Sequence, residues 1–205
     1  MSTLLYISSS LFGDQGNSSQ LAREFIQRWQ AGHPGSRVIE RDLTASPLAH
    51  LDGARVGAFF TPAEQRSAAQ QAMVAESDAL IAELNAADLV VIGLPMYNFG
   101  VPTQFKAWVD NIARAGVTFR YTDNGPVGLV ENKPVIVFAA RGGLYANTPH
   151  DHQEPFVRQF FGFIGVNDVR FVYAEGVNMG DDAKAKALAD ARAEIDTLVN
   201  TVRAA

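Results

Sequence analysis

The sequence predicts an α/β fold in which a parallel sheet of five strands is covered by helices on both faces. Short, continuous apolar runs recur along the chain, as expected for strands buried on both faces of a sheet. Segments with apolar residues at helical spacing separate these runs. Strands and helices that alternate in this way form a parallel sheet with right-handed crossovers.

Five runs are predicted to form the sheet, at residues 3–8, 37–43, 88–93, 134–140 and 169–174. The second run is the most polar, as an edge strand would be. The loops after the first and third strands have unusual compositions. We therefore expect the flavodoxin-like strand order 2-1-3-4-5, because that order puts its ligand-binding switch point between those two strands.

Five helices are predicted, over residues 19–31, 62–85, 102–112, 152–163 and 182–203. Ser18 or Ser19 is a suitable N-cap for the first helix, and Pro102 can occupy the first turn of the third. Residues 46–61 are predicted to be a loop that ends in exposed aromatic residues. Residues 117–128 are predicted to form a hairpin that turns at Asn124-Gly125.

Composition limits the class of protein. The 205 residues fit one domain, residues 1–205. The chain has 17 Lys and Arg against 22 Asp and Glu, without a basic cluster, which argues against nucleic acid as a partner. Because the chain has no cysteine, disulfides, thiolate metal ligands and cysteine nucleophiles are excluded. No apolar run could span a bilayer and no signal peptide is recognisable, so we expect a soluble, cytoplasmic protein.

The turn after the first strand, residues 9–19, has the composition of a phosphate-binding site. Ser10, Asn17 and Ser18 offer hydroxyl and amide groups, Gly16 frees the backbone, and the N-terminus of the next helix attracts an anion. Neither a Gly-x-Gly-x-x-Gly motif nor a Walker lysine is present, which favours a phosphate monoester. The alternative is a serine-rich turn with a helix-capping residue.

The loop after the third strand, residues 95–102, has the composition expected around a flat heteroaromatic ring. Tyr97 and Phe99 provide aromatic faces, and Asn98 provides donors and acceptors for ring nitrogens. The alternative is that both aromatic residues cap the core. Residues 141–143, Arg-Gly-Gly, follow the fourth strand, and their amides could meet the carbonyl edge of the same ring.

These three loops are predicted to converge. The carboxyl ends of parallel strands share one edge of the sheet, so the loops after the first, third and fourth strands lie together. A phosphate site at one end and a ring site at the other describe a mononucleotide flavin, FMN.

Six short motifs are distinctive in combination: Met96-Tyr97-Asn98-Phe99 and residues 114–121, 124–126, 141–143, 162–165 and 174–176. This combination, spread over essentially the whole chain, resembles the FMN-dependent NADH-azoreductase family, of the flavodoxin-like NAD(P)H:quinone reductase superfamily. The resemblance implies that FMN is bound by Ser10, Gly16, Asn17, Ser18, Pro95, Met96, Tyr97, Asn98, Phe99, Ala140, Arg141, Gly142 and Gly143. Ala140 stands where the family often has serine, which removes one hydroxyl contact and leaves the backbone contact.

The resemblance also implies a homodimer with two sites at its interface, each covered by residues of the other subunit. The residues assigned to this substrate pocket are Phe60, Phe99, Phe119, Tyr121 and Phe163. The expected acceptors are flat aromatic molecules such as azo dyes and quinones. Because Phe60 stands where some relatives carry arginine, a preference for NADH or NADPH is not inherited.

The implied reaction is a two-electron, ping-pong hydride transfer from NADH or NADPH through FMN to the acceptor, with no catalytic side chain. One alternative is an electron-carrier flavodoxin, which would pass single electrons to protein partners. Another is an interaction module of the same fold that binds no flavin. No metal site is expected, because the group His150, Asp151, His152 and Glu154 belongs to one loop and is predicted to be a solvated turn.

Overall fold

Five parallel strands form the central sheet in the order β2-β1-β3-β6-β7. In the computed structural model, which describes residues 2–202, these strands are β1 (Thr3–Ser8), β2 (Arg37–Asp42), β3 (Leu89–Pro95), β6 (Val135–Arg141) and β7 (Val169–Glu175). All four neighbouring pairs are parallel. The order is the predicted one when the two strands of a separate hairpin are left out of the count.

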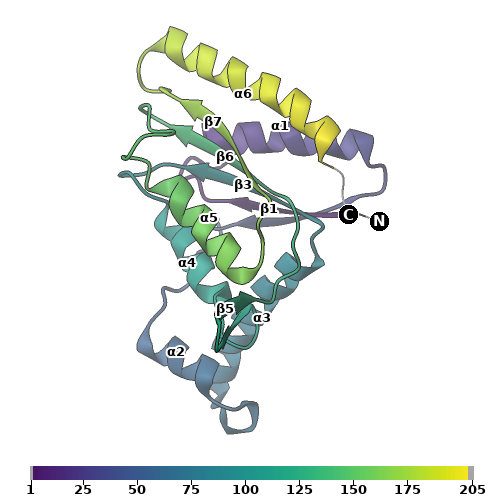
Figure 1. The fold of residues 1–205 in the computed structure, drawn as a ribbon, viewed down its shortest axis with the longest axis vertical. Coiled ribbons are helices and arrows are strands. Elements are labelled where there is room, and N and C mark those ends of the chain that lie inside the picture. The colour runs from purple at the N-terminus through teal and green to yellow at the C-terminus, as the bar shows by residue number, and fades with distance from the viewer. Residues whose placement is uncertain (1, 203–205) are drawn as a thin grey trace.

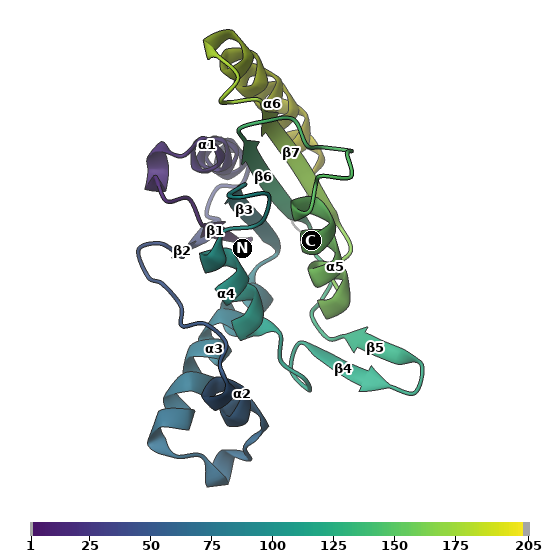
Figure 2. The same ribbon diagram turned by 90° about the vertical axis from the view of Figure 1, so that its left-hand side faces the viewer.

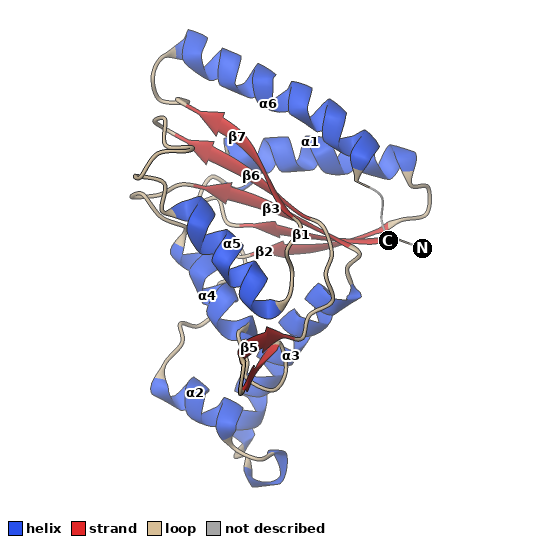
Figure 3. Cartoon of the chain, viewed as in Figure 1, coloured by secondary structure: helices blue, strands red, loops and turns tan. Residues whose placement is uncertain are grey.

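Helices cover both faces of the sheet (Figures 1 and 3). On one face lie α1 (Asn17–Gly32) and α6 (Asp181–Thr201), and on the other lie α3 (Ala68–Ala86), α4 (Thr103–Ile112) and α5 (Gln153–Ile164). Alternate residues of each strand point to opposite faces of the sheet. In β1, Leu5 and Ile7 pack in the hydrophobic core on one face, and Leu4 and Tyr6 pack in the core on the other. All residues of β3 and β6 are buried, as expected for central strands.

Two predicted helix starts are wrong by a few residues. The first helix begins at Asn17 with Gly16 as its N-cap, so Ser18 and Ser19 lie buried inside the first turn instead of capping it. The helix predicted from residue 62 is preceded by a 3-10 turn, η2 (Ala63–Gln65). It starts only at Ala68, where Ser67 and Gln70 form a reciprocal capping box.

The second half of the predicted loop over residues 46–61 is a helix, α2 (Gly53–Phe60). The Asp52 side chain caps it by accepting a hydrogen bond from the amide of Arg55 at 2.8 Å. The buried Arg55 side chain donates to Glu76 at 2.7 Å and to Asn111 at 2.9 Å. These contacts to α3 and α4 outweigh the weak helix propensity of the two glycines in α2.

The predicted hairpin is present as β4 (Phe119–Thr122) and β5 (Gly125–Gly128), and it projects from the body of the molecule (Figure 2). At Gly128 a Cβ would lie 2.1 Å from the amide nitrogen of Gly165, so only glycine fits there against the end of α5. A further 3-10 turn, η1 (Gly13–Gln15), precedes α1. Met1 and the predicted end of the last helix at Arg203 lie outside the described residues. Among residues 2–202, no helix is long and apolar enough to cross a membrane.

Candidate functional site

A cavity of about 130 Å³ opens between the loops that follow β1, β3, β6 and β7. Its lining residues are Ser10, Phe12, Gly16, Asn17, Ser18, Pro95, Met96, Tyr97, Ala140, Gly142, Val177 and Asn178. Most of the residues predicted to bind the cofactor belong to this set, and Asn98, Phe99, Arg141 and Gly143 do not. Asn98 lines a neighbouring cavity of about 580 Å³, which shares Met96 and Tyr97 with the first.

The serine-rich turn is packed tightly around Ser10. This side chain is only 2% exposed, and its hydroxyl accepts a hydrogen bond from the Phe12 amide at 3.2 Å. A Cβ on Gly16 would lie 2.1 Å from Ser10 Oγ, so the turn closes over Ser10 only with glycine at this position. Gly13 has a φ of +53°, which bends the chain into the short 3-10 turn ahead of α1.

The N-terminal end of α1 lies at this cavity with no side-chain cap. The hydroxyl of Ser18 is buried there and has no hydrogen-bond partner within residues 2–202. Buried polar groups are normally paired, so an unpaired hydroxyl at a helix N-terminus indicates a ligand with acceptor oxygens. No Lys, Arg, Asp or Glu is among the cavity-lining residues, so an anion here would be held by amides and hydroxyls.

Residues 97–100 form a tight turn with two residues, Asn98 and Phe99, at its strained tip. Tyr97 and Gly100 exchange backbone hydrogen bonds at 3.2 and 3.1 Å, while Asn98 and Phe99 have φ values of +49° and +68°. The left-handed conformation is tolerated by asparagine but is unfavourable for a bulky residue such as phenylalanine. The Phe99 side chain is 59% exposed. Strain of this kind concentrates at ligand-binding sites, so this turn is a functional candidate.

Hydrogen bonds connect the loops around the cavity. The hydroxyl of Tyr97 accepts from the amide of Leu11 at 3.1 Å, which joins the turn after β1 to the turn after β3. The Met96 amide donates to the Ala140 carbonyl at 3.0 Å. The loop after β7 continues the sheet pairing, because the amide of Asn178 donates to the Gly142 carbonyl at 3.2 Å.

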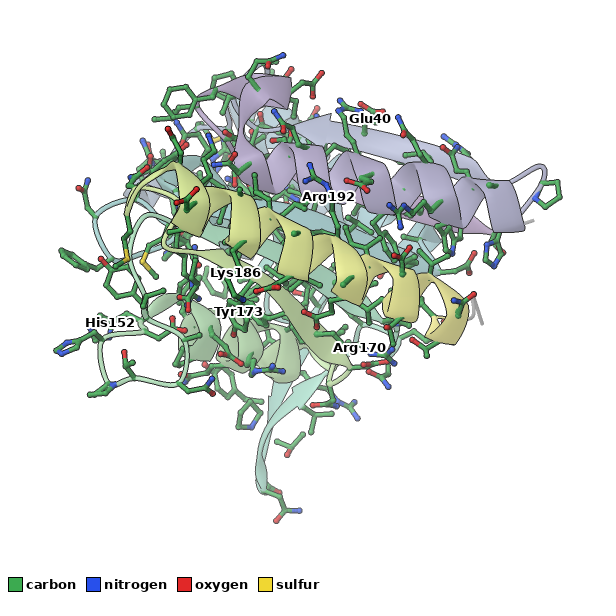
Figure 4. All side chains as sticks on the ribbon, turned by 90° about the horizontal axis from the view of Figure 1, so that it is seen from above. Glu40, His152, Arg170, Tyr173, Lys186 and Arg192 are labelled. Carbon is green, nitrogen blue, oxygen red and sulfur yellow. The ribbon has the colours of Figure 1, made fainter. Side chains whose placement is uncertain are left out.

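The Arg141 side chain is turned away from the cavity. It is fully buried and pairs with Asp151, at 2.8 Å, and with Glu175, at 3.1 Å. The prediction of a solvated turn is therefore wrong for Asp151, whose side chain is 4% exposed. Figure 4 shows His152 pointing outward at the rim of the molecule. Within the described part of the chain, no three His, Asp or Glu side chains are grouped as metal ligands.

Sequence reasoning missed three cavity residues, Phe12, Val177 and Asn178. Phe12 belongs to the turn already identified. Its side chain is 70% exposed, so it is not part of the hydrophobic core. Val177 and Asn178 follow the last strand of the sheet. Because this strand is parallel to the others, the rule that selected the other three loops would also have selected this one.

The residues predicted to cover the substrate pocket lie away from the cavity within one chain. Phe60 is the last residue of α2 and is 74% exposed. Phe119 contacts Tyr121 and Phe163, with ring centroids 5.6 and 4.3 Å away, on the hairpin and α5. Figure 1 shows α2 and the hairpin below the sheet, whereas the cavity loops lie where the strand arrows end. Phe99 alone of this set belongs to a cavity loop and meets Tyr145 edge-on at 5.9 Å.

Residues 2–199 match the model of the Flavodoxin_2 family, which is described as a flavodoxin-like fold. The chain is 59% identical to an FMN-dependent NADH:quinone oxidoreductase from Alcanivorax borkumensis, over 94% of this chain and 97% of that protein. It is 55% identical to a protein of the same name from Cellvibrio japonicus, over 96% and 98% of the two chains.

Solved structures give the same picture of the fold. The crystal structure of an azoreductase from Bacillus anthracis str. Sterne matches with a TM-score of 0.90 and 27% identity, over 98% of this chain and 100% of that one. A structure of an FMN-dependent NADH-azoreductase in complex with FMN, from Bacillus anthracis str. Ames Ancestor, matches with a TM-score of 0.89 over 98% and 99% of the chains. At 23% identity it supports the fold alone.

Proposed function

This chain belongs to the Flavodoxin_2 family, and we propose that it is an FMN-dependent oxidoreductase that uses NADH or NADPH to reduce quinones and azo compounds. Relatives more than half identical over nearly the whole chain are named FMN-dependent NADH:quinone oxidoreductase, which supports the flavin, the nicotinamide donor and the quinone. The azoreductase with 27% identity supports the azo acceptor.

The observation that carries this proposal is the fit of a phosphate group to the turn after β1. A buried serine hydroxyl without a partner, an uncapped helix N-terminus and a glycine with no room for a Cβ meet at one cavity. Oxygen atoms of a phosphate would accept hydrogen bonds from the hydroxyls and from the first amides of α1. We assign Ser10, Gly16, Asn17 and Ser18 to the FMN phosphate.

We assign residues 95–99 and 140–143 to the flavin ring. The carbonyl groups of Gly142 and Gly143 accept hydrogen bonds from the amides of Asn178 and Gly176, which hold this loop beside the loop after β7. When bound there, FMN would supply the hydride chemistry for a two-electron, ping-pong transfer from the nicotinamide to the acceptor. The chain orients the ring, shields one of its faces from water, and donates hydrogen bonds where negative charge grows. We assign no side chain as a catalyst.

We also propose that two copies of the chain complete two active sites. Phe60 and Tyr121 are more than 70% exposed, and aromatic side chains of this size supply much of the buried area where they enter an interface. An apolar hollow of about 520 Å³ on α5, lined by Phe156, Gln159, Phe160 and Phe163, offers a surface for a second copy. In such a dimer Phe60, Phe119, Tyr121 and Phe163 of one chain would close the acceptor pocket over Phe99 of the other.

The flavin is tested by titrating FMN into the purified apoprotein and following the quenching of flavin fluorescence, with one FMN bound per chain expected. Absence of binding would favour the interaction module that binds no flavin. The reaction is tested by following NADH oxidation with a quinone and then with an azo dye. A protein that binds FMN but oxidises no NADH or NADPH in either assay would be an electron carrier.

Two further measurements test the finer points. Initial rates at several quinone concentrations should give parallel double-reciprocal lines, and intersecting lines would contradict the ping-pong order. Sedimentation at the assay concentration should give the mass of two chains. Full activity of a monomer would contradict the shared site.

A further inference from the structure

A fully buried arginine lies behind the loops assigned to the flavin ring. Arg141 ends β6 and has no exposed surface, and its guanidinium makes four hydrogen bonds. Two go to the carboxylate of Asp151, at 2.8 and 3.2 Å, one goes to Glu175 at 3.1 Å, and one goes to the side-chain oxygen of Gln153 at 3.2 Å. Four of the five N–H donors of an arginine are thus used inside the protein.

The bond to Gln153 connects Arg141 to the turn after β3. The side-chain nitrogen of Gln153 donates to the carbonyl of Pro95 at 3.0 Å, and all atoms of this link are buried. Pro95 is the last residue of β3 and precedes Met96 and the strained turn. The orientation of Gln153 is fixed because its two ends have different partners: its oxygen accepts from Arg141 and its nitrogen donates to Pro95.

The bond to Glu175 connects Arg141 to the loop after β6. The same carboxylate oxygen of Glu175 accepts hydrogen bonds from the backbone amides of Tyr145, at 2.8 Å, and Ala146, at 2.9 Å. Tyr145 is the residue that meets Phe99 edge-on across the site. One guanidinium therefore fixes both loops that are assigned to the ring, each through one intermediate side chain.

The charges in this network restrict how far its members can move. The buried carboxylate of Asp151 and the partly exposed carboxylate of Glu175 share a single guanidinium. The guanidinium also lies over the ring of Tyr173, with its central carbon 4.8 Å from the ring centroid. Buried charges must stay paired, so a shift of either loop would leave a charge or a carbonyl without its partner. Loops held in this way are ordered before a ligand arrives, which lowers the entropy lost on binding.

We infer that Arg141 is a positioning residue: through Gln153 and Glu175 it fixes the spacing between the turn after β3 and the loop after β6, and its side chain makes no contact with the cofactor. This inference rests on the proposed function and adds to it, because it assigns binding energy for FMN to a link that lies outside the cavity.

The test uses two variants of the network and one control. Gln153→Leu removes the neutral link to Pro95 while leaving all buried charges in place. Arg141→Lys keeps the positive charge but loses the planar fork that holds several acceptors at once. Arg170→Gln is the matched control. This arginine, labelled in Figure 4, lies on β7, and its side chain is 37% exposed. Its guanidinium donates to Asp168 and to no other side chain of the described residues. For each protein we would measure the Kd for FMN, the visible spectrum of bound FMN, and the Tm of the apoprotein.

Both network variants should raise the Kd for FMN by about tenfold and shift the flavin spectrum, by analogy with the loss of residues that orient a metal ligand. The control should keep the Kd and the spectrum of the wild type. A merely structural role would lower the Tm of the apoprotein and leave the Kd of the folded protein unchanged. If Arg141→Lys weakens binding and Gln153→Leu does not, the link through Gln153 is disproved. If the wild type itself binds no FMN, the proposed function fails, whereas equal binding by all four proteins overturns only this inference.

Discussion

Gly16→Ala places a methyl group where the structure has no room for one. The new Cβ would lie 2.1 Å from Ser10 Oγ and 2.8 Å from Ser10 Cβ, and Ser10 is almost fully buried. A change of the Ser10 rotamer can move its hydroxyl but not its Cβ, so the backbone of the turn or the start of α1 must move. Overpacking of this kind costs about 1–3 kcal/mol. For a chain of this size that corresponds to a fall in Tm of about 2–12 °C.

Gly32→Ala is the matched control, because Gly32 ends the same helix and an added Cβ there meets nothing within 4 Å. This substitution should leave stability unchanged or raise it slightly, since alanine favours a helix. Thermal unfolding of both apoproteins and fluorescence titration with FMN measure the two effects. Gly16→Ala should lower the Tm and weaken FMN binding, whereas Gly32→Ala should do neither.

Adding Ser10→Gly to Gly16→Ala separates packing from binding. Removing the serine side chain relieves both close contacts, so most of the lost stability should return. FMN binding should stay weak, because the hydroxyl assigned to the phosphate is gone. The reasoning is refuted if Gly16→Ala keeps the Tm and the Kd of the wild type, or if the double variant is no more stable than Gly16→Ala.

Three other substitutions test the rest of the structure. Lys133→Met should lower the free energy of unfolding, measured in urea, by about 1–3 kcal/mol. The buried ammonium of Lys133 donates to three carbonyls at the end of α3, the nearest being that of Ala87 at 2.6 Å, and methionine would leave these carbonyls without this donor. Asp42→Asn should reduce the loss of stability in acid. Burial favours the neutral acid, but hydrogen bonds from Thr44 and Ala45 outweigh it and hold the pKa of Asp42 below its ordinary value. The carboxylate therefore contributes stability above the ordinary pKa of aspartate, and this contribution is lost as the pH falls through the folded pKa. Urea unfolding between about pH 2 and 7 would detect this, and an unchanged acid slope would contradict it. Phe60→Ala should leave the Tm and FMN binding unchanged but raise the KM for quinone, because this side chain is 74% exposed in one chain and is assigned to the pocket of the other; an unchanged KM would remove Phe60 from the pocket.

The sheet and the location of the site could be predicted because their signals are local. Short continuous apolar runs such as Leu89–Ile92 are typical of strands buried on both faces of a sheet, and the loops after parallel strands lie at one edge. Once the strands were assigned, the convergence of three loops followed without further information. The fourth loop, which contributes Val177 and Asn178, obeys the same rule but has no conspicuous composition.

The features that could not be predicted depend on contacts between distant residues. Gly53 and Gly57 make α2 a poor helix by propensity, yet Arg55 binds Glu76 and Asn111 on two other helices and holds it in place. The direction of the Arg141 side chain is decided in the same way. Two glycines follow Arg141 in the sequence and suggest an approach to a ligand, while its charged partners lie 10 and 34 residues further along the chain.

Some of the residues that break local rules belong to the proposed active site. Phe99 takes up a left-handed conformation that a phenylalanine avoids, the buried Ser18 hydroxyl has no partner among residues 2–202, and Phe60 is exposed. Each of these costs free energy in the isolated chain, and each loses part of that cost when a ligand or a second chain is added. A flavin ring could pack near the exposed Phe99, and a phosphate could accept a hydrogen bond from the Ser18 hydroxyl. A dimer would cover Phe60. Features that conflict locally but agree with one binding mode are what selection for function produces, since selection for stability alone would remove them.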